Sequence, residues 1–400
     1  MDAGSGAVFS STAHELRRTK RMRLGRRIIE LAVLLTVLLG SSPLSAHANY
    51  FSTAKFTAYS AAGRFPFWSS SWVPLERRIF LDAQGIPYVQ YSAGKSYNAT
   101  TVSLIGLLAY DRFLDGRKEK DRTQFLQIAQ WLRAHQDESC GCWAHDFDLT
   151  HSTLDETMHA PWASAMTQGL ALSVLTRAYA LGGDAGFLHA AKRGMLPFEK
   201  PVQQGGVRRE FLGFAPAADA MSMPFFEEYP TQPDPSYTLN GFMFALLGLY
   251  DLAQTGNVEA GRLFADGMRT LHAALPLYDL GDGSSYDLTH LTRAPRGVHR
   301  DLGYHLVHIT ELNALGSATQ DATLLWYRDR WNGYGNRLDA EAVWLEHFGI
   351  WILFRGRWLL VIIALMALAC GQWLVRLVRA RTRRGTASGV ARPVSVMVGS

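Results

Sequence analysis

Apolar side chains recur at three- and four-residue intervals from about residue 100 to residue 334. This spacing places them on one face of an α-helix, so each run predicts an amphipathic helix that buries one side. Short links such as Gly182-Gly183-Asp184 and Thr255-Gly256-Asn257 separate the runs, as expected at helix C-termini. Successive amphipathic helices with short links predict a mainly α fold, an incomplete (α/α) toroid of stacked helix pairs. The predicted helices cover residues 101–114, 124–135, 163–181, 187–195, 239–254, 259–275, 304–316 and 322–334.

A different pattern precedes these helices. Residues 78–91 form two short β-prone runs around Gln84-Gly85, which predicts a β-hairpin. Residues 49–75 are rich in Phe, Trp and Ser without any period, and we interpret them as an extended arm. The predicted organisation of the body is therefore an arm and hairpin over 49–98, followed by a helical domain over 99–350.

Apolar segments flanked by basic residues lie near both ends. Residues 1–48 combine a basic region, an apolar run and a small-residue site, which is typical of a signal peptide or, uncleaved, of a signal anchor. Residues 357–376 contain an uncharged run of about eighteen residues, long enough for a transmembrane helix. The basic residues of 377–400 predict a cytoplasmic tail. We expect one membrane span, or two with an uncleaved signal, and a periplasmic, lumenal or extracellular domain between them.

Charge is distributed unevenly along the chain. The formal net charge is +5, yet residues 49–354 hold 25 Lys and Arg against 32 Asp and Glu. An acidic body argues against a nucleic-acid partner, because neutralising phosphates requires a basic face. An anionic ligand would therefore have to be held by a local cluster of basic residues.

Three short clusters bring chemically active side chains together. The first is Glu227-Glu228-Tyr229, ahead of a proline-rich approach to the helix predicted over 239–254. The second is a glycine-rich loop that ends in Tyr286-Asp287, and the third is Tyr304-His305 with His308, where residues 304 and 308 share a helix face. Each also has an ordinary explanation: charge at a helix start, a buried ring with a satisfied hydroxyl, or packing.

Nothing in the sequence predicts a metal or a cofactor. His305 and His308 are three residues apart with no nearby third ligand. The three cysteines form no metal-binding pattern. Cys140-Gly141-Cys142 is spaced too closely for a disulfide without strain, and Cys370 lies in an apolar run.

Together with their neighbours, the three clusters resemble the C-terminal domain of D-glucuronyl C5-epimerases. These enzymes convert D-glucuronate to L-iduronate in heparin and heparan sulfate precursors. The resemblance runs from about residue 80 to residue 335, in order and at similar spacing. It rests on residues 161–169, 227–231, 239–243, 248–251, 275–279, 286–290 and 304–309.

The resemblance implies an (α/α) toroidal domain, often dimeric, with a β-hairpin that helps to line the site. Two departures stand out: the β-sandwich domain that animal members insert is absent here, and Thr289 stands where the family has an arginine. The implied catalytic group is Glu228, Tyr229, Tyr286 and Tyr304. The candidates for substrate binding are Asn240, His305, His308, Arg293, Arg296, Arg300, Trp162 and Gln168.

The implied reaction makes specific demands. The C5 proton of a uronate is weakly acidic, so the adjacent carboxylate must be neutralised or protonated. Inversion needs a base on one face of the ring and an acid on the other, for which Glu228 and Tyr304 are candidates. A tyrosine, with a reference pKa of about 10, would need nearby cations to act as a phenolate. His305 and the arginines of residues 293–300 are the candidates for that role.

We therefore predict an isomerase, a uronate C5-epimerase that acts on an anionic polysaccharide. A polysaccharide lyase is the nearest alternative, because it removes the same proton and then expels the C4 oxygen. A non-catalytic polysaccharide-binding subunit is the alternative from a different class.

Overall fold

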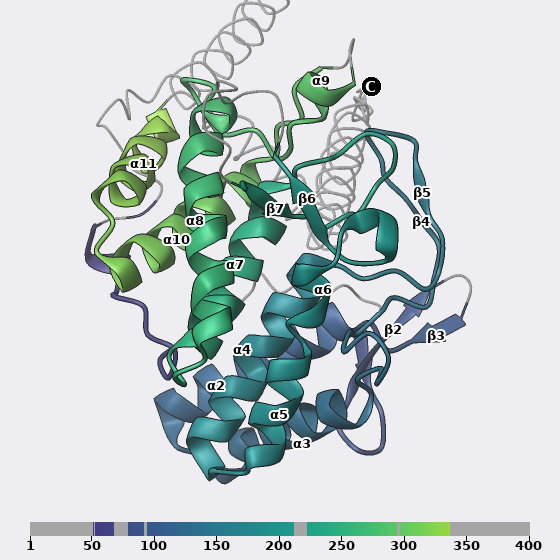
Figure 1. Ribbon diagram of the computed structural model, residues 1–400. Coiled ribbons are helices and arrows are strands. Elements are labelled where there is room, and N and C mark those ends of the chain that lie inside the picture. Colours follow the sequence, from purple (N-terminus) through teal and green to yellow (C-terminus); the bar gives the residue numbers. More distant parts are fainter. Residues whose placement is uncertain are drawn as a thin grey trace, which may run out of the picture. The chain divides into compact units, whose positions relative to one another are not determined.

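The computed structural model describes residues 51, 53–67, 79–91, 94–211, 222–293 and 297–336. The predicted signal segment, transmembrane helix and cytoplasmic tail lie outside these residues. Among the helices that the structure describes, none is long and apolar enough to cross a membrane. This part of the chain is mainly helical, as predicted, with three small antiparallel sheets (Figure 1).

All eight predicted helices are present, with ends shifted by a few residues. Side-chain oxygens of Asn98, Asp184, Asn257, Asp301 and Asp321 accept backbone N–H groups at five of their N-termini. The short helices α6 (Leu196–Glu199) and α9 (Thr289–Thr292) were not predicted, since four residues carry no period. The predicted helices are α2 (Ala99–Gly116), α3 (Glu119–Ala134), α4 (Ala165–Gly182), α5 (Ala185–Arg193), α7 (Leu239–Ala253), α8 (Val258–Tyr278), α10 (Leu302–Thr319) and α11 (Ala322–Asn332).

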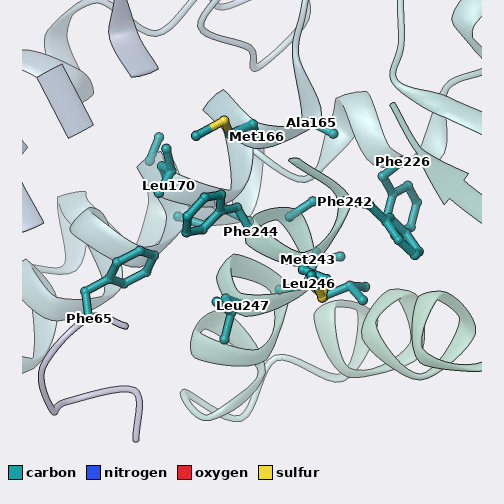
Figure 2. Packing of buried hydrophobic residues seen from close by; sticks show 14 of the residues in the cluster. Phe65, Ala165, Met166, Leu170, Phe226, Phe242, Met243, Phe244, Leu246 and Leu247 are labelled. Atoms are coloured by element: carbon teal, nitrogen blue, oxygen red, sulfur yellow. The ribbon is translucent and has the colours of Figure 1, made fainter. Parts of the chain in front are cut away.

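Helices α4 and α7 pack directly against each other (Figure 1). Gly169 and Gly248 permit this close approach, because a Cβ at either position would overlap the backbone of the facing helix. Phe244 and Leu170 belong to the apolar cluster between them (Figure 2). The consecutive pairs α2–α3, α4–α5, α7–α8 and α10–α11 also pack together, as a toroid of helix pairs requires. Closure of the ring stays a prediction.

The predicted hairpin is confirmed. Strands β1 (Ile79–Leu81) and β2 (Pro87–Tyr91) pair antiparallel around Gly85, which has φ 79°. A third strand, β3 (Gly94–Ser96), extends this sheet. Two further ribbons pair β4 (Leu149–Thr150) with β5 (Thr157–Met158) and β6 (Arg208–Glu210) with β7 (Pro224–Phe226).

The described part of the predicted arm, residues 53–67, has only the 3-10 turn η1 (Thr53–Lys55) as regular structure. Its side chains Tyr59 and Phe65 are buried in the helical core. The ring of Phe65 stacks on Phe244 of α7, with centroids 5.8 Å apart. This segment therefore packs into the domain instead of extending from it.

The structure corrects the prediction for the cysteines, because Cys140 and Cys142 form a disulfide. Gly141 between them adopts φ 67°, a left-handed conformation that glycine allows and that turns the chain back on itself. The two Cα atoms are 5.1 Å apart, within the usual span of a disulfide.

Candidate active site

The four predicted catalytic residues converge from three separate segments. Glu228 and Tyr229 follow strand β7, Tyr286 ends the loop after α8, and Tyr304 lies in the first turn of α10. The hydroxyl oxygens of Tyr229 and Tyr286 are 3.4 Å apart, and the ring centroids of Tyr286 and Tyr304 are 4.5 Å apart. The fold thus brings one carboxylate and three phenols into a single group.

Glu228 is buried against the first turn of α7. Gly241 makes room for it, because a Cβ at that position would overlap the Glu228 side chain. Burial raises the pKa of Glu228 to about 7, and the neighbouring Tyr229 hydroxyl, Gly241 N–H and Asn240 amide only partly oppose this rise. A carboxyl group with a pKa near neutrality can both take and return a proton at physiological pH.

A second buried carboxyl group, Glu311 of α10, was missed in the sequence. Neither of its oxygens has a hydrogen-bond partner of ordinary geometry in the described structure, and the same holds for both amide atoms of Asn240, Nε2 of His308 and Oε2 of Glu228. Burial, and then the charge of Glu228, raises the pKa of Glu311 well above its usual range. Buried polar groups are normally satisfied, so this concentration is unusual for a structural core and typical of a functional site.

Tyr229 and Tyr286 remain proton donors. Burial raises the pKa of Tyr229 and of Tyr286 well above 10, and the charge of Glu228 raises both further. His305 is poorly suited to supply a compensating cation. Burial lowers the pKa of His305 to about 4, so its ring is neutral at physiological pH.

His305 and His308 instead fasten the loop of Tyr286 to α10. The Ser284 N–H donates to Nδ1 of His305 at 3.1 Å, and Nε2 of His305 donates to the Trp331 carbonyl at 3.2 Å. The hydroxyl oxygen of Ser284 lies 2.8 Å from Nδ1 of both histidines. Among the described residues, no cluster of His, Cys, Asp or Glu could hold a metal ion.

Comparison with known proteins agrees with this geometry. Residues 136–333 match the family described as D-glucuronyl C5-epimerase C-terminus. The chain is 35% identical over 244 residues to D-glucuronyl C5-epimerase of Caenorhabditis elegans, across 57% of this chain and 38% of that protein. The chain belongs to the D-glucuronyl C5-epimerase family. Membership supports an epimerase-type function and confirms the resemblance seen in the sequence.

Two further similarities are weaker. The chain is 30% identical over 190 residues to an uncharacterised protein of Methanocaldococcus jannaschii, across 47% of this chain and 56% of that protein. It therefore spans less than two thirds of the length of either curated relative. Among solved structures, it is similar to a family 76 glycoside hydrolase from a bovine Bacteroides thetaiotaomicron strain. The TM-score is 0.41 and the sequence identity 12%, over 62% of this chain and 50% of that one.

The arginines expected to bind substrate have carboxylate partners where they are described. Nη1 of Arg293 donates to the Leu154 carbonyl at 2.5 Å and lies 3.4 Å from the Glu156 carboxylate. Arg300 pairs with Asp282 at 2.7 Å. Arg296 lies outside the described residues, so its role stays a prediction.

Trp162 and Gln168 hold protein groups in place. The Trp162 indole N–H donates to the Phe147 carbonyl at 2.8 Å, and its ring packs on His145. Gln168 is fully buried, and its amide bonds both the N–H and the carbonyl of Trp143. These contacts give both side chains a structural role that does not depend on substrate binding.

At the family's arginine position, Thr289 is buried and donates its hydroxyl to Oδ1 of Asp287 at 2.7 Å. The other oxygen of Asp287 lies 3.0 Å from Nδ1 of His299. His299 was missed in the sequence because it lies in an irregular segment without a recognisable motif. The one hint in the sequence is that His299 is a titratable residue five positions before Tyr304.

Proposed function

We propose that this epimerase-family chain inverts C5 of hexuronate units in an anionic polysaccharide, converting D-glucuronate to L-iduronate. The placement of Glu228 carries the proposal: a buried carboxyl group with a pKa of about 7, grouped with Tyr229, Tyr286 and Tyr304. Nothing else in the described group both ionises near neutrality and lies among several hydroxyl donors.

In the proposed reaction, ionised Glu228 takes the C5 proton, and the electron pair of the C–H bond moves into the uronate carboxyl group. The hydroxyl of Tyr304 then gives its proton to the opposite face of C5, which inverts the centre. The hydroxyls of Tyr229 and Tyr286 stabilise the enolate-like state by hydrogen bonds, a role that suits their high pKa. The proton on Glu228 returns to the Tyr304 oxygen through solvent, and no cofactor is required.

The proposal extends to the setting of the reaction. The predicted span over residues 357–376 would hold the domain at the outer side of a membrane, where polysaccharides are exported or displayed. The toroid and the dimer expected from the resemblance belong to the same proposal.

The test is incubation of the full chain with several glucuronate-containing polysaccharides in deuterium oxide, followed by NMR. We expect deuterium at C5 and the appearance of L-iduronate signals, with no product that absorbs in the ultraviolet. An ultraviolet-absorbing unsaturated uronate would identify a lyase instead. Absence of C5 exchange with every polyuronate would refute the epimerase proposal.

A further inference from the structure

His299 is fixed beside one of the proposed catalytic tyrosines. Its ring packs edge-on against Tyr286, with centroids 4.7 Å apart. The backbone reinforces this placement, because the Tyr286 N–H donates to the His299 carbonyl at 2.8 Å. The imidazole therefore belongs to the candidate active site, although no pattern in the sequence marked it.

A buried carboxylate orients the ring. Asp287 is fully buried, and its Oδ1 accepts the N–H and the hydroxyl of Thr289 at 3.1 and 2.7 Å. Its Oδ2 lies 3.0 Å from Nδ1 of His299 and accepts a hydrogen bond from that nitrogen. The side chain of His299 is 33% exposed, and Nε2 has no hydrogen-bond partner among the described residues. Nδ1 is thus held by Asp287, while Nε2 of this partly exposed side chain has no partner in the described structure.

The surroundings of the ring favour its protonated form. The hydrogen bond to Asp287 raises the pKa of His299, partial burial opposes it, and the charges of Asp287 and Asp301 raise it further. The other polar groups at the ring are the Tyr286 phenol and the Thr153 hydroxyl, which lies 3.5 Å from Nδ1. An imidazolium at this position is the kind of group that recognises a carboxylate.

Four other basic groups described near the site are paired or neutral. Arg293 and Arg300 have carboxylate partners, and Arg209 pairs with Glu227 at 3.2 Å. His305 is neutral for the reason given above. A uronate carboxylate placed beside Tyr286 would lie within reach of the His299 ring, which packs against that tyrosine.

We propose that protonated His299, oriented by Asp287, binds the substrate's uronate carboxylate through Nε2–H beside Tyr286. This inference rests on the proposed function and adds the group that neutralises the carboxylate before C5 loses its proton. It predicts that KM rises as the pH rises through the pKa of His299, because the imidazolium is lost. The free enzyme must also carry ionised Glu228 to react, so kcat/KM is bell-shaped in pH.

The test compares two substitutions at His299 in the full chain. His299→Gln removes the charge, whereas His299→Arg keeps it but no longer titrates. KM and kcat for C5 exchange are measured from about pH 5.5 to about pH 8.5, a window that spans the titration of histidine. We expect His299→Gln to raise KM at the acid end on the order of 10- to 100-fold, with a smaller effect on kcat. His299→Arg should keep KM close to the wild-type value and make it independent of pH.

Unchanged KM and pH dependence in His299→Gln would overturn the inference. Circular dichroism of each variant confirms folding, which a partly exposed side chain should not control. Wild-type exchange serves as the control for the proposed function: if the wild type exchanges no uronate, that function fails. Calorimetric titration with the polyuronate still decides the inference in that case. Weaker binding by His299→Gln at low pH supports it, and equal binding overturns it.

Discussion

In the described part of the chain, two clusters of buried polar side chains are built in opposite ways. In the first, Arg177 of α4 and Asp251 of α7 are fully buried, with Nη1 2.5 Å from Oδ2. Tyr59 donates its hydroxyl to Asp251 at 2.8 Å and accepts from Arg177 at 3.0 Å. Each charge faces an opposite charge and further hydrogen bonds. Through Tyr59, this cluster holds residues 53–67 against α4 and α7.

The second cluster consists of Glu228, Asn240, His308 and Glu311. Its members are also buried, yet polar atoms of all four lack hydrogen-bond partners of ordinary geometry in the described structure. Unsatisfied buried groups destabilise a fold, so proteins retain them chiefly where function requires them. We infer that the first cluster stabilises the fold, whereas the second lowers its stability and is retained for function.

The largest expected effect distinguishes Glu228 from its neighbour. Glu228→Gln should slow C5 exchange about 10²- to 10⁴-fold, because it removes the general base, while leaving the free energy of unfolding unchanged or higher. Glu227 is the matched control: it is fully buried, with a pKa also raised to about 7, but it pairs with Arg209. Glu227→Gln should lower the free energy of unfolding and retain exchange below its unfolding temperature. Identical behaviour of the two variants would contradict the contrast.

Substitutions in the first cluster should lower the free energy of unfolding. Asp251→Ala leaves the fully buried guanidinium of Arg177 without a counter-charge, which we expect to lower the free energy of unfolding by about 3–5 kcal/mol. Urea denaturation followed by circular dichroism measures this loss. A loss below about 1 kcal/mol, the range of a surface ion pair, would show that the pair does not hold the core.

Stability should also depend on pH through the second cluster. The pKa of Glu228 is raised from 4.5 to about 7 in the folded protein. The folded state therefore binds the proton more tightly than the unfolded chain, so its contribution is complete below pH 4.5 and declines up to about pH 7. The expected decline is on the order of 3 kcal/mol. Urea denaturation across this range should show it in the wild type. Glu228→Gln should remove the share of Glu228 and leave the decline that Glu227 contributes, because the pKa of Glu227 is raised to about 7 as well.

The smallest expected effect concerns the space for Glu228. Gly241→Ala places a methyl group where the Glu228 side chain lies, which should cost about 1–3 kcal/mol of stability. The displaced carboxylate should also slow C5 exchange. Gly261→Ala in α8 is the control, since a Cβ there meets only Ala253 at 3.9 Å, an ordinary contact. Equal rates and stabilities for the two variants would show that Gly241 does not position Glu228.

The helices and the first hairpin could be predicted because their signals are local: a 3.6-residue period, capping residues and a turn glycine. The meeting of Glu228 with Tyr286 could not be read from spacing, since the two are 58 positions apart and their approach depends on how α7 and α10 pack. It came from the resemblance to a family.

What was missed depended on tertiary context. Glu311 is a single charge in an apolar run, and only burial beside Glu228 makes it unusual. His299 gains its importance from a partner that the fold brings to it. The disulfide was misjudged because the conformation of Gly141 is not visible in the sequence.

The central claim is that Glu228 moves the C5 proton of a uronate. The most direct test incubates wild type and Glu228→Gln with the same polyuronate in deuterium oxide and counts C5-deuterated uronates by mass spectrometry. The account predicts deuterium at C5 of uronates turned over by the wild type, and incorporation slowed about 10²- to 10⁴-fold by a correctly folded Glu228→Gln. Deuterium incorporation by Glu228→Gln at the wild-type rate would contradict it.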